Sequence, residues 1–355
     1  MALNIKVGKP RLTLHQGYTV AVARPDGQIH GGGQDGLFFL DTRLINTWEI
    51  DVNDKPWTLL NSGSPGGSVG RVYLTNPDFS VDGRVVPSEA LGLVFSRHID
   101  GGMHEDIDII NHHIEAVQFD LNLTIKGDFA DLFEVKGEKV TKRGKITTHW
   151  DAIGQVMTTS YRNRDFFRAF RITAKKNDAS MALANGKLSF AVEIPPGECW
   201  HTCLFYDFAD GDVWSEAPLL CGCDHEKSES GQAVKKWRAN VLKVETGNSG
   251  FAHAFAQALD DMSALRLPIE GTDDVKFVPA AGLPWFVALF GRDSLIISLQ
   301  SSIVHPEFAR GALHVLAKWQ ATEQDDYRDA EPGKIHHELR RGELAHFKLI
   351  PHTPY

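Results

Sequence analysis

The sequence predicts a protein of two parts, an antiparallel β-sandwich followed by an α-helical domain. The chain has 355 residues, which is more than one hydrophobic core usually serves, so two domains are expected. In the first half apolar and polar residues alternate, as in strands with one buried face. From Ser249 onward apolar residues recur at three- and four-residue steps, as in amphipathic helices.

The β-sandwich is predicted from segments with a two-residue period. In Val117–Lys126 every second residue from Val117 is apolar and the others are polar, so this segment is expected to form a half-buried antiparallel strand. The segment Lys187–Phe208 contains two further strands on either side of a Pro-Pro-Gly turn. Turn signals recur along the first half, and many short strands at this spacing favour a large sandwich up to about Asp212.

Three helices are predicted in the second half. The first begins at Ser249, with Asn248 or Ser249 itself as the capping residue. The second is expected over Ser294–Val304, and Pro306 suits the first turn of the third. The apolar side of the third helix is formed by Phe308, Ala312, Leu313, Leu316 and Trp319.

The two halves are joined by a polar linker. Cys223–Gln232 lacks a hydrophobic period, and a short helix is expected around Ala233–Val244. We therefore expect a β-sandwich domain over residues 1–225, a linker with a short helix over 226–248, and a helical domain over 249–355. Three helices are too few to enclose a core of their own, so we expect the helical domain to be incomplete in this chain.

Composition excludes several classes of partner. The formal net charge of -9 disfavours nucleic acid and anionic membrane surfaces. The longest apolar stretch, Ala280–Phe290, is too short to span a bilayer, and the N-terminus has no apolar segment of signal-peptide length. Four cysteines give a chain of this length no disulfide framework. We expect a cytoplasmic protein with reduced thiols.

Three motifs suggest chemistry that their surroundings do not support. His30–Gly33 (HGGG) and Gly66–Gly70 (GGSVG) match esterase patterns, but Ser68 lies in NSGSPGGSVGRVYL (Asn61–Leu74), a flexible loop that leads into a strand. An esterase nucleophile needs a strand before it and a helix after it. The segment Cys221–His225 (CGCDH) lacks the second ligand pair that zinc sites usually have. We therefore expect no metal and no cofactor.

The stretch Trp285–Leu295 (WFVALFGRDSL) is the strongest candidate for a site. Its apolar run is interrupted by Arg292 and Asp293, beside the aromatic residues Trp285, Phe286 and Phe290. We expect Asp293 to cap the helix that follows, but a helix cap does not explain the arginine, because a cation at a helix N-terminus opposes the dipole. Aromatic faces beside an Arg–Asp pair suit a sugar ring and its adjacent hydroxyls.

A second charged cluster lies in Asp329–Phe347. It combines His337, Glu338 and Arg340 with turn residues, which is typical of loops that carry function. A solvated loop at the start of a helix is the alternative interpretation.

The sequence also resembles a known family. The stretches GLPWFVALFGRDSL and EPGKIHHELRRGELAHFKLIPHTPY, together with Asp35–Asn53, are similar to bacterial-type glycogen debranching enzymes of the amylo-α-1,6-glucosidase class. The resemblance implies a β-sandwich followed by an (α/α)6 toroid, and hydrolysis of α-1,6-glucosidic branch linkages with inversion. It implies substrate-binding roles for Trp285, Phe290, Arg292, Asp293, His337, Glu338 and Arg340.

Inversion requires a carboxylic acid and a carboxylate base. The resemblance places both downstream of Tyr355, so we expect no catalytic residue in this chain, and we expect Glu338 and Asp293 to position an α-glucan. The chain would then be an inactive fragment, with a C-terminal fragment as a complementing partner. Two alternatives remain open, a non-catalytic carbohydrate-binding or scaffold protein completed by a partner chain, and a related α-glycosidase acting on another sugar.

Overall fold

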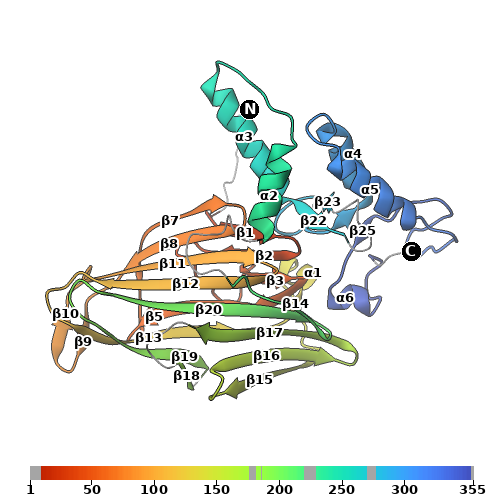
Figure 1. Cartoon of the computed structure of the whole chain (residues 1–355). Coiled ribbons are helices and arrows are strands. Elements are labelled where there is room, and N and C mark those ends of the chain that lie inside the picture. The colour runs from red at the N-terminus through yellow and green to blue at the C-terminus, as the bar shows by residue number, and fades with distance from the viewer. Residues whose placement is uncertain (1–8, 176–180, 185, 220–228, 270–276, 353–355) are drawn as a thin grey trace, which may run out of the picture.

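The strands of the first half form a layered β-domain, and the helices of the second half gather beside one end of it (Figure 1). The computed structural model describes residues 9–175, 181–184, 186–219, 229–269 and 277–352. Every strand pairing described between named strands is antiparallel.

The largest sheet has nine strands. Eight of them follow the order β15-β16-β17-β20-β12-β11-β8-β7, and β21 pairs with β20. Their bounds are β7 Thr58–Gly66, β8 Val69–Thr75, β11 Leu91–Asp100, β12 Gly102–Asn111, β15 Lys145–Asp151, β16 Val156–Asn163, β17 Phe166–Lys175, β20 Cys199–Asp210 and β21 Val213–Ser215.

Two five-stranded sheets complete the β-domain. The first has the order β18-β19-β13-β5-β6, with bounds Met181–Ala184, Lys187–Ile194, Val117–Lys126, Thr47–Val52 and Lys55–Pro56. The second has the order β1-β2-β3-β4-β14, with bounds Leu12–Gln16, Thr19–Ala23, Gly36–Phe39, Thr42–Ile45 and Ala130–Asp131. A small hairpin, β9 Phe79–Val81 and β10 Arg84–Val86, forms a separate two-stranded sheet.

One hydrophobic core joins the three sheets. Trp48 of the β18–β6 sheet, Leu37 of the β1–β14 sheet, and Phe95 and Phe170 of the nine-stranded sheet all belong to it. Each of these four side chains is at most 1% exposed. The alternating strands therefore bury their apolar faces against each other, and the predicted antiparallel β-sandwich is confirmed.

The structure also tests the individual strands. Val117–Lys126 forms β13 as predicted. The two strands predicted within Lys187–Phe208 are β19 and β20, but they belong to different sheets, so the Pro-Pro-Gly turn carries the chain from one layer to another. Residues 61–66 were expected in a loop and instead end β7. This strand lies at the sheet edge and is mostly exposed, so its pairing with β8 leaves no hydrophobic alternation to detect.

Four longer helices follow the β-domain, with bounds α2 Glu229–Ala239, α3 Ser249–Ala264, α4 Gly291–Ser301 and α5 Glu307–Lys318. Asn248 caps α3 by accepting a hydrogen bond from the Phe251 amide, as predicted. Helix α4 begins three residues earlier than expected. In α5, Val315 is buried, whereas Leu313, which was predicted on the apolar side, is 62% exposed. Two short helices are α1 Leu132–Lys136 and α6 Glu343–His346.

A second core joins the helices to the β-domain. Val20 and Phe38, from β2 and β3, belong to the same buried cluster as Ala312 and Leu316 of α5. The cluster also includes residues of the short ladder between β22 Arg266–Pro268 and β23 Phe277–Pro279. The domain boundaries at residues 225 and 248 stay predictions, and so does the (α/α)6 toroid, which the described helices do not show.

The contact between α5 and β23 supports one prediction. A Cβ atom on Gly311 would lie 1.9 Å from the carbonyl oxygen of Phe277. Because both elements must then move apart, we expect Gly311→Ala to lower the free energy of unfolding by about 1–3 kcal/mol. Gly250→Ala in α3 is the matched control, since its Cβ would meet only Asn248 Oδ1 at 3.4 Å. Urea unfolding that shows equal stability for both variants would contradict the prediction.

Candidate functional site

The two motifs singled out in the sequence meet in one short ladder. Strand β24, Leu289–Phe290, pairs with β25, Glu338–Leu339, and Phe290 lies opposite Glu338. The amide of Gly291 donates a hydrogen bond to the carbonyl oxygen of His337 at 3.0 Å. A Cβ on Gly291 would lie 2.2 Å from the carbonyl oxygen of His336, so this approach requires glycine. The stretch from Trp285 and the cluster around Arg340 therefore form one site.

Arg340 is the most heavily bonded residue of this site. Its side chain is 2% exposed, and it forms ion pairs with Asp41 at 2.9 Å and with Glu338 at 2.7 Å. Its Nη2 also donates to the carbonyl oxygen of Trp285 at 2.9 Å. Burial lowers the pKa of Arg340. The negative charges of Asp41 and Glu338 together raise it by a larger amount, so the pKa lies above the usual value for arginine. Arg340 therefore stays charged and fixes the ladder to the β-domain.

Both carboxylate oxygens of Glu338 are engaged. Oε2 accepts from Arg340, and Oε1 lies 3.1 Å from Nε2 of His352. Burial lowers the pKa of His352, and Glu338 opposes that shift. Because neither oxygen of Glu338 is left open, this residue is poorly placed to deliver a proton to a leaving group. The geometry suits a positioning role.

Two aspartates of the β-domain hold the chain that follows Arg340. Asp41 Oδ2 accepts a hydrogen bond from the Arg341 amide at 2.8 Å, and Asp131 Oδ2 accepts one from the Leu344 amide at 3.0 Å. Asp41 lies within a stretch quoted for the family resemblance, but the sequence gives no sign that it contacts a residue 300 positions later. Sequence reasoning missed both aspartates.

The aromatic residues of the site are mostly packed. Trp285 is half-buried and lies edge-on to Phe38, with ring centroids 6.0 Å apart. Phe290 is 6% exposed, and the guanidinium carbon of Arg340 lies 5.4 Å from its ring centroid. Phe286 is the more open ring at 40% exposed, and Lys136 Nζ of α1 lies 4.8 Å from its centroid. Phe286 was predicted as one of the aromatic residues beside the Arg–Asp pair, whereas Lys136 was not predicted.

Arg292 and Asp293 lie exposed in the first turn of α4. Among the described residues neither forms a hydrogen bond or ion pair, so the predicted Arg–Asp fork is not assembled in this structure. The prediction that Asp293 caps the helix is wrong. Phe290 occupies the cap position without a side-chain bond, because pairing with β25 brings the chain into the helix already at Gly291.

His337 is exposed and lies beside the ladder, with its ring 6.0 Å from the rings of Phe290 and His352. The structure thus brings together Trp285, Phe290, His337, Glu338 and Arg340 and places Arg292 and Asp293 at the adjoining helix start. Two open cavities, of about 510 and 930 Å³, are lined by other residues. Neither of these two cavities is lined by a predicted site residue.

The esterase motifs have no catalytic geometry. Ser68 lies in the turn between β7 and β8, and no helix follows it. His30–Gly33 lies in the connection between the paired strands β2 and β3. Both observations agree with the glycine-rich turns expected from the sequence.

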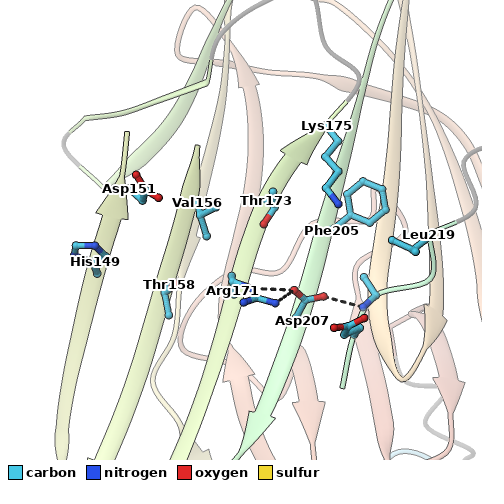
Figure 2. Close-up of a pocket in the computed structure, with 12 residues that line it drawn as sticks. His149, Asp151, Val156, Thr158, Arg171, Thr173, Lys175, Phe205, Asp207 and Leu219 are labelled. Atoms are coloured by element: carbon cyan, nitrogen blue, oxygen red, sulfur yellow. Dashed lines mark hydrogen bonds and ion pairs between the residues drawn. The ribbon is translucent and has the colours of Figure 1, made fainter. Parts of the chain in front are cut away.

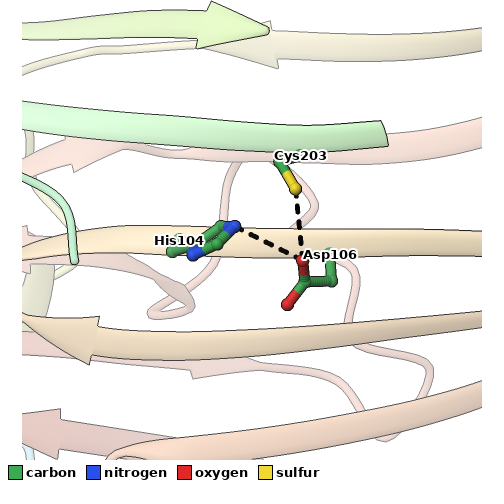
Figure 3. Close-up of side chains that lie close together, drawn as sticks. All are labelled: His104, Asp106 and Cys203. Carbon is green, nitrogen blue, oxygen red and sulfur yellow. Dashed lines mark hydrogen bonds and ion pairs between the residues drawn. The ribbon is translucent and has the colours of Figure 1, made fainter. Parts of the chain in front are cut away.

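One group of potential metal ligands lies in the nine-stranded sheet. Donor atoms of His104, Asp106 and Cys203 are within 4.8 Å of one another (Figure 3). Cys203 is disulfide-bonded, contrary to the expectation of reduced thiols, so it offers no thiolate. One imidazole and one carboxylate remain in this group, fewer than zinc requires. The segment Cys221–His225 lies outside the described residues.

The family to which the chain belongs is shown by the sequence of its β-domain. Residues 14–205 match the N-terminal domain of (some) glycogen debranching enzymes, and this match covers more than half of the chain. The chain belongs to this debranching-enzyme family. Membership places it among carbohydrate-active proteins of the glycoside-hydrolase kind.

One solved structure has a similar fold over most of this chain. A candidate kojibiose phosphorylase from the human microbiome is similar over 87% of this chain and 47% of its own, with a TM-score of 0.52 and 10% identity. The debranching-family chain thus spans about half the length of that structure. A galactose mutarotase-like protein from Clostridium acetobutylicum is similar over 56% of this chain and 95% of its own, with a TM-score of 0.29 and 8% identity.

No curated protein matches the chain. None of the described helices is both long enough and apolar enough to cross a membrane.

Acid is expected to weaken the site through His336. This side chain is 2% exposed, and burial is the main cause that lowers its pKa from 6.5 to about 4. The folded state therefore holds His336 neutral, and its contribution to stability is present above pH 6.5 and lost as the pH falls towards 4. The pKa difference corresponds to about 3 kcal/mol.

We expect His336→Gln to reduce the fall in melting temperature between pH 7 and pH 4.5, because glutamine does not titrate. His314→Gln, at an exposed position of α5, is the control and should keep the wild-type pH dependence. Equal pH dependence in both variants would count against a neutral, buried His336.

Proposed function

We propose that this chain carries the substrate-positioning half of an enzyme that hydrolyses α-1,6-glucosidic branch linkages of glycogen or a related α-glucan, with inversion. The observation that carries the proposal is the β24–β25 ladder, which joins the two sugar-site motifs and lies against Asp41 of the family-defining domain. In this proposal Arg292 and Asp293 hold hydroxyls of the terminal glucose, and Phe286 and His337 offer ring faces beside them.

The catalytic pair is proposed to lie outside this chain. An inverting enzyme needs an acid and a base separated by about 6.5–9.5 Å, with room for a water molecule. Glu338 has both oxygens engaged, and Asp293 is an exposed residue without a described partner. We assign both to positioning and expect the acid and base downstream of Tyr355, on the continuing chain or on a complementing C-terminal fragment.

The exposed faces of the helices support a completing segment. Helix α4 buries Ser294, Ser298 and Ser301, while Ile296 and Leu299 are 57% and 77% exposed. A surface helix normally shows the reverse pattern. Contiguous apolar surface of this kind marks a binding face, and we propose that further helices of the same cytoplasmic enzyme cover it. Nucleic acid and membrane have no role in the proposal.

Glucose release from a limit dextrin tests the proposal. The chain alone is expected to release no more glucose than a heat-denatured control, and activity is expected when the downstream segment is present on the same chain or added as a fragment. Activity of the chain alone would contradict the assigned roles and make Glu338 the first catalytic candidate. No activity with the downstream segment would contradict the debranching function.

A non-catalytic role is the second candidate, because both oxygens of Glu338 are engaged. In that case the chain is a carbohydrate-binding or scaffold protein completed by a partner. It would bind a limit dextrin with and without the downstream segment and would release glucose in neither case.

A further inference from the structure

A groove of about 510 Å³ crosses one face of the nine-stranded sheet (Figure 2). Its floor is formed by β15, β16, β17 and β20, and the segment 216–219 lines it as well. The volume lies within the range of about 300–1,000 Å³ that is usual for small-molecule sites. None of the proposed substrate-positioning residues lines this groove.

The strand register aligns the floor side chains in two rows. Residues that face each other across antiparallel strands project on the same side of the sheet. The first row is His149, Thr158, Arg171 and Asp207, and the second is Asp151, Val156, Thr173 and Phe205. Both rows line the groove. Donors and acceptors therefore alternate with apolar surface over adjacent strands, as a ring with several hydroxyls requires.

Arg171 and Asp207 form a fixed pair at the centre of this floor. Arg171 donates to Asp207 Oδ2 from Nε at 2.9 Å and from Nη2 at 2.7 Å, and the Ala217 amide donates to Oδ1 at 2.8 Å. The guanidinium carbon lies 4.7 Å from the ring centroid of Trp214. These contacts hold the pair in one orientation, whereas Nη1 of Arg171 has no described hydrogen-bond partner and can donate to a ligand.

The charges of the groove are mixed. Arg171 and Lys175 face three carboxylates, Asp151, Asp207 and Glu216, and His149 adds an imidazole. A polyanion would meet these carboxylates, and a cation would meet the two basic groups. A neutral ligand with many hydroxyls can use both kinds of group, since an arginine donates and a carboxylate accepts at adjacent hydroxyls.

We propose that this groove is a second glycan-binding site, which holds a neutral α-glucan chain apart from the site at the β24–β25 ladder. The assignment to a neutral polyol comes from the groove, and the choice of an α-glucan rests on the proposed function. Arg171 and Asp207 bind adjacent hydroxyls, and Thr158 and Thr173 add hydroxyl contacts along the floor. A chain held here would keep a branched polymer attached while its ends are processed elsewhere.

Calorimetry of the whole chain with maltoheptaose, combined with hydrogen exchange, tests the proposal. Maltoheptaose is expected to protect peptides within 145–175 and 204–217 and to bind with little dependence on salt concentration, because the ligand is neutral. Arg171→Lys should weaken this binding at least tenfold, because a lysine cannot donate from two nitrogens to Asp207 Oδ2 and keep a third nitrogen, Nη1, for the ligand. Asp207→Asn should also weaken it, while keeping an acceptor for the Ala217 amide.

Two controls separate this groove from the proposed substrate site. Arg84→Lys, at an exposed position of the β9–β10 hairpin, should leave the affinity and the protection unchanged. Arg292→Lys should leave protection of the groove peptides unchanged. All variants should melt at the wild-type temperature, and a groove variant that does not fold is replaced by Thr173→Val, which alters the floor without touching the Arg–Asp pair.

Each outcome either supports or overturns the second glycan-binding site. Protection of the groove that is lost in Arg171→Lys and kept in Arg292→Lys supports the second site, even if the debranching proposal fails. The second site is overturned by binding that Arg292→Lys abolishes and Arg171→Lys does not affect, an outcome that leaves the proposed function standing. It is also overturned by the absence of binding at about 10 mM ligand, where a millimolar site would be mostly occupied.

Discussion

Replacing Glu105 with alanine is expected to lower the free energy of unfolding by about 3–5 kcal/mol, because the change leaves a buried charge without its partner. Glu105 lies opposite Arg97 on adjacent strands of the nine-stranded sheet, and their side chains are 0% and 2% exposed. Arg97 also lies 4.2 Å from the ring centroid of Trp48 and donates to the carbonyl oxygen of Gly27. The guanidinium group is therefore held in the protein interior and is not hydrated when Glu105 is removed.

A double variant tests this explanation. Arg97→Met combined with Glu105→Leu removes both charges and should recover most of the stability, since apolar replacements of buried ion pairs are often neutral. Recovery should be incomplete, because Tyr206 donates to Glu105 and would lose that acceptor.

An exposed ion pair provides the control. Asp54 contacts Lys187 at 2.6 Å, but the Asp54 side chain is 79% exposed. Its φ is 60°, a conformation that asparagine tolerates better than alanine, so Asp54→Asn should change stability by less than about 1 kcal/mol. Urea unfolding followed by circular dichroism measures all four proteins. If the double variant were as unstable as Glu105→Ala alone, the unpaired buried charge of Arg97 would not be the cause of the lost stability.

The β-sandwich could be predicted because its signal is local. Alternation along Val117–Lys126 directly records one buried face, and the structure shows this strand with the predicted bounds. Sheet membership could not be predicted, because β19 and β20 are neighbours in sequence yet pair in different sheets. The choice depends on partners such as β12 and β13, which lie far away in the chain.

The start of α4 shows the same limit. The sequence favoured Asp293 as a cap from local propensity alone, but β25 pairs with β24 and draws Gly291 close to His336 and His337. This long-range contact, which tolerates only glycine, moves the helix start. Local rules therefore located the helix and misplaced its first residue.

The candidate site was predictable as two motifs and not as an assembly. Charged residues inside an apolar run identified Arg292, and the cluster after Gly333 identified Glu338 and Arg340. Nothing in either motif indicated Asp41 or Asp131, which hold the second motif from the β-domain. Their contacts depend on how the helical half packs against β2 and β3, which follows from the shared core and not from any local pattern.

Two conservative substitutions are expected to reduce the activity of the completed enzyme by about tenfold to a thousandfold in kcat/KM, or roughly 1.4–4 kcal/mol of transition-state binding. Asp293→Asn removes the charge that strengthens a hydrogen bond to a glucose hydroxyl. Arg292→Lys replaces a planar fork by a point charge. Both residues are exposed and make no described hydrogen bond or ion pair, so the melting temperature should stay within about 2 °C of wild type, as for most surface substitutions.

The pattern across assays distinguishes a sugar clamp from an ordinary helix start. If Asp293 serves only the helix dipole, Asp293→Asn costs about 0.3–1 kcal/mol of stability and leaves kinetics unchanged. In that case Arg292→Lys changes neither assay, because α4 keeps a cation at the same place. Arg310→Lys, at an exposed position of α5, is the matched control and should change neither the kinetics nor the stability. Wild-type kinetics in both Asp293→Asn and Arg292→Lys would remove the pair from the substrate site and leave the β24–β25 ladder as a structural joint between the two halves.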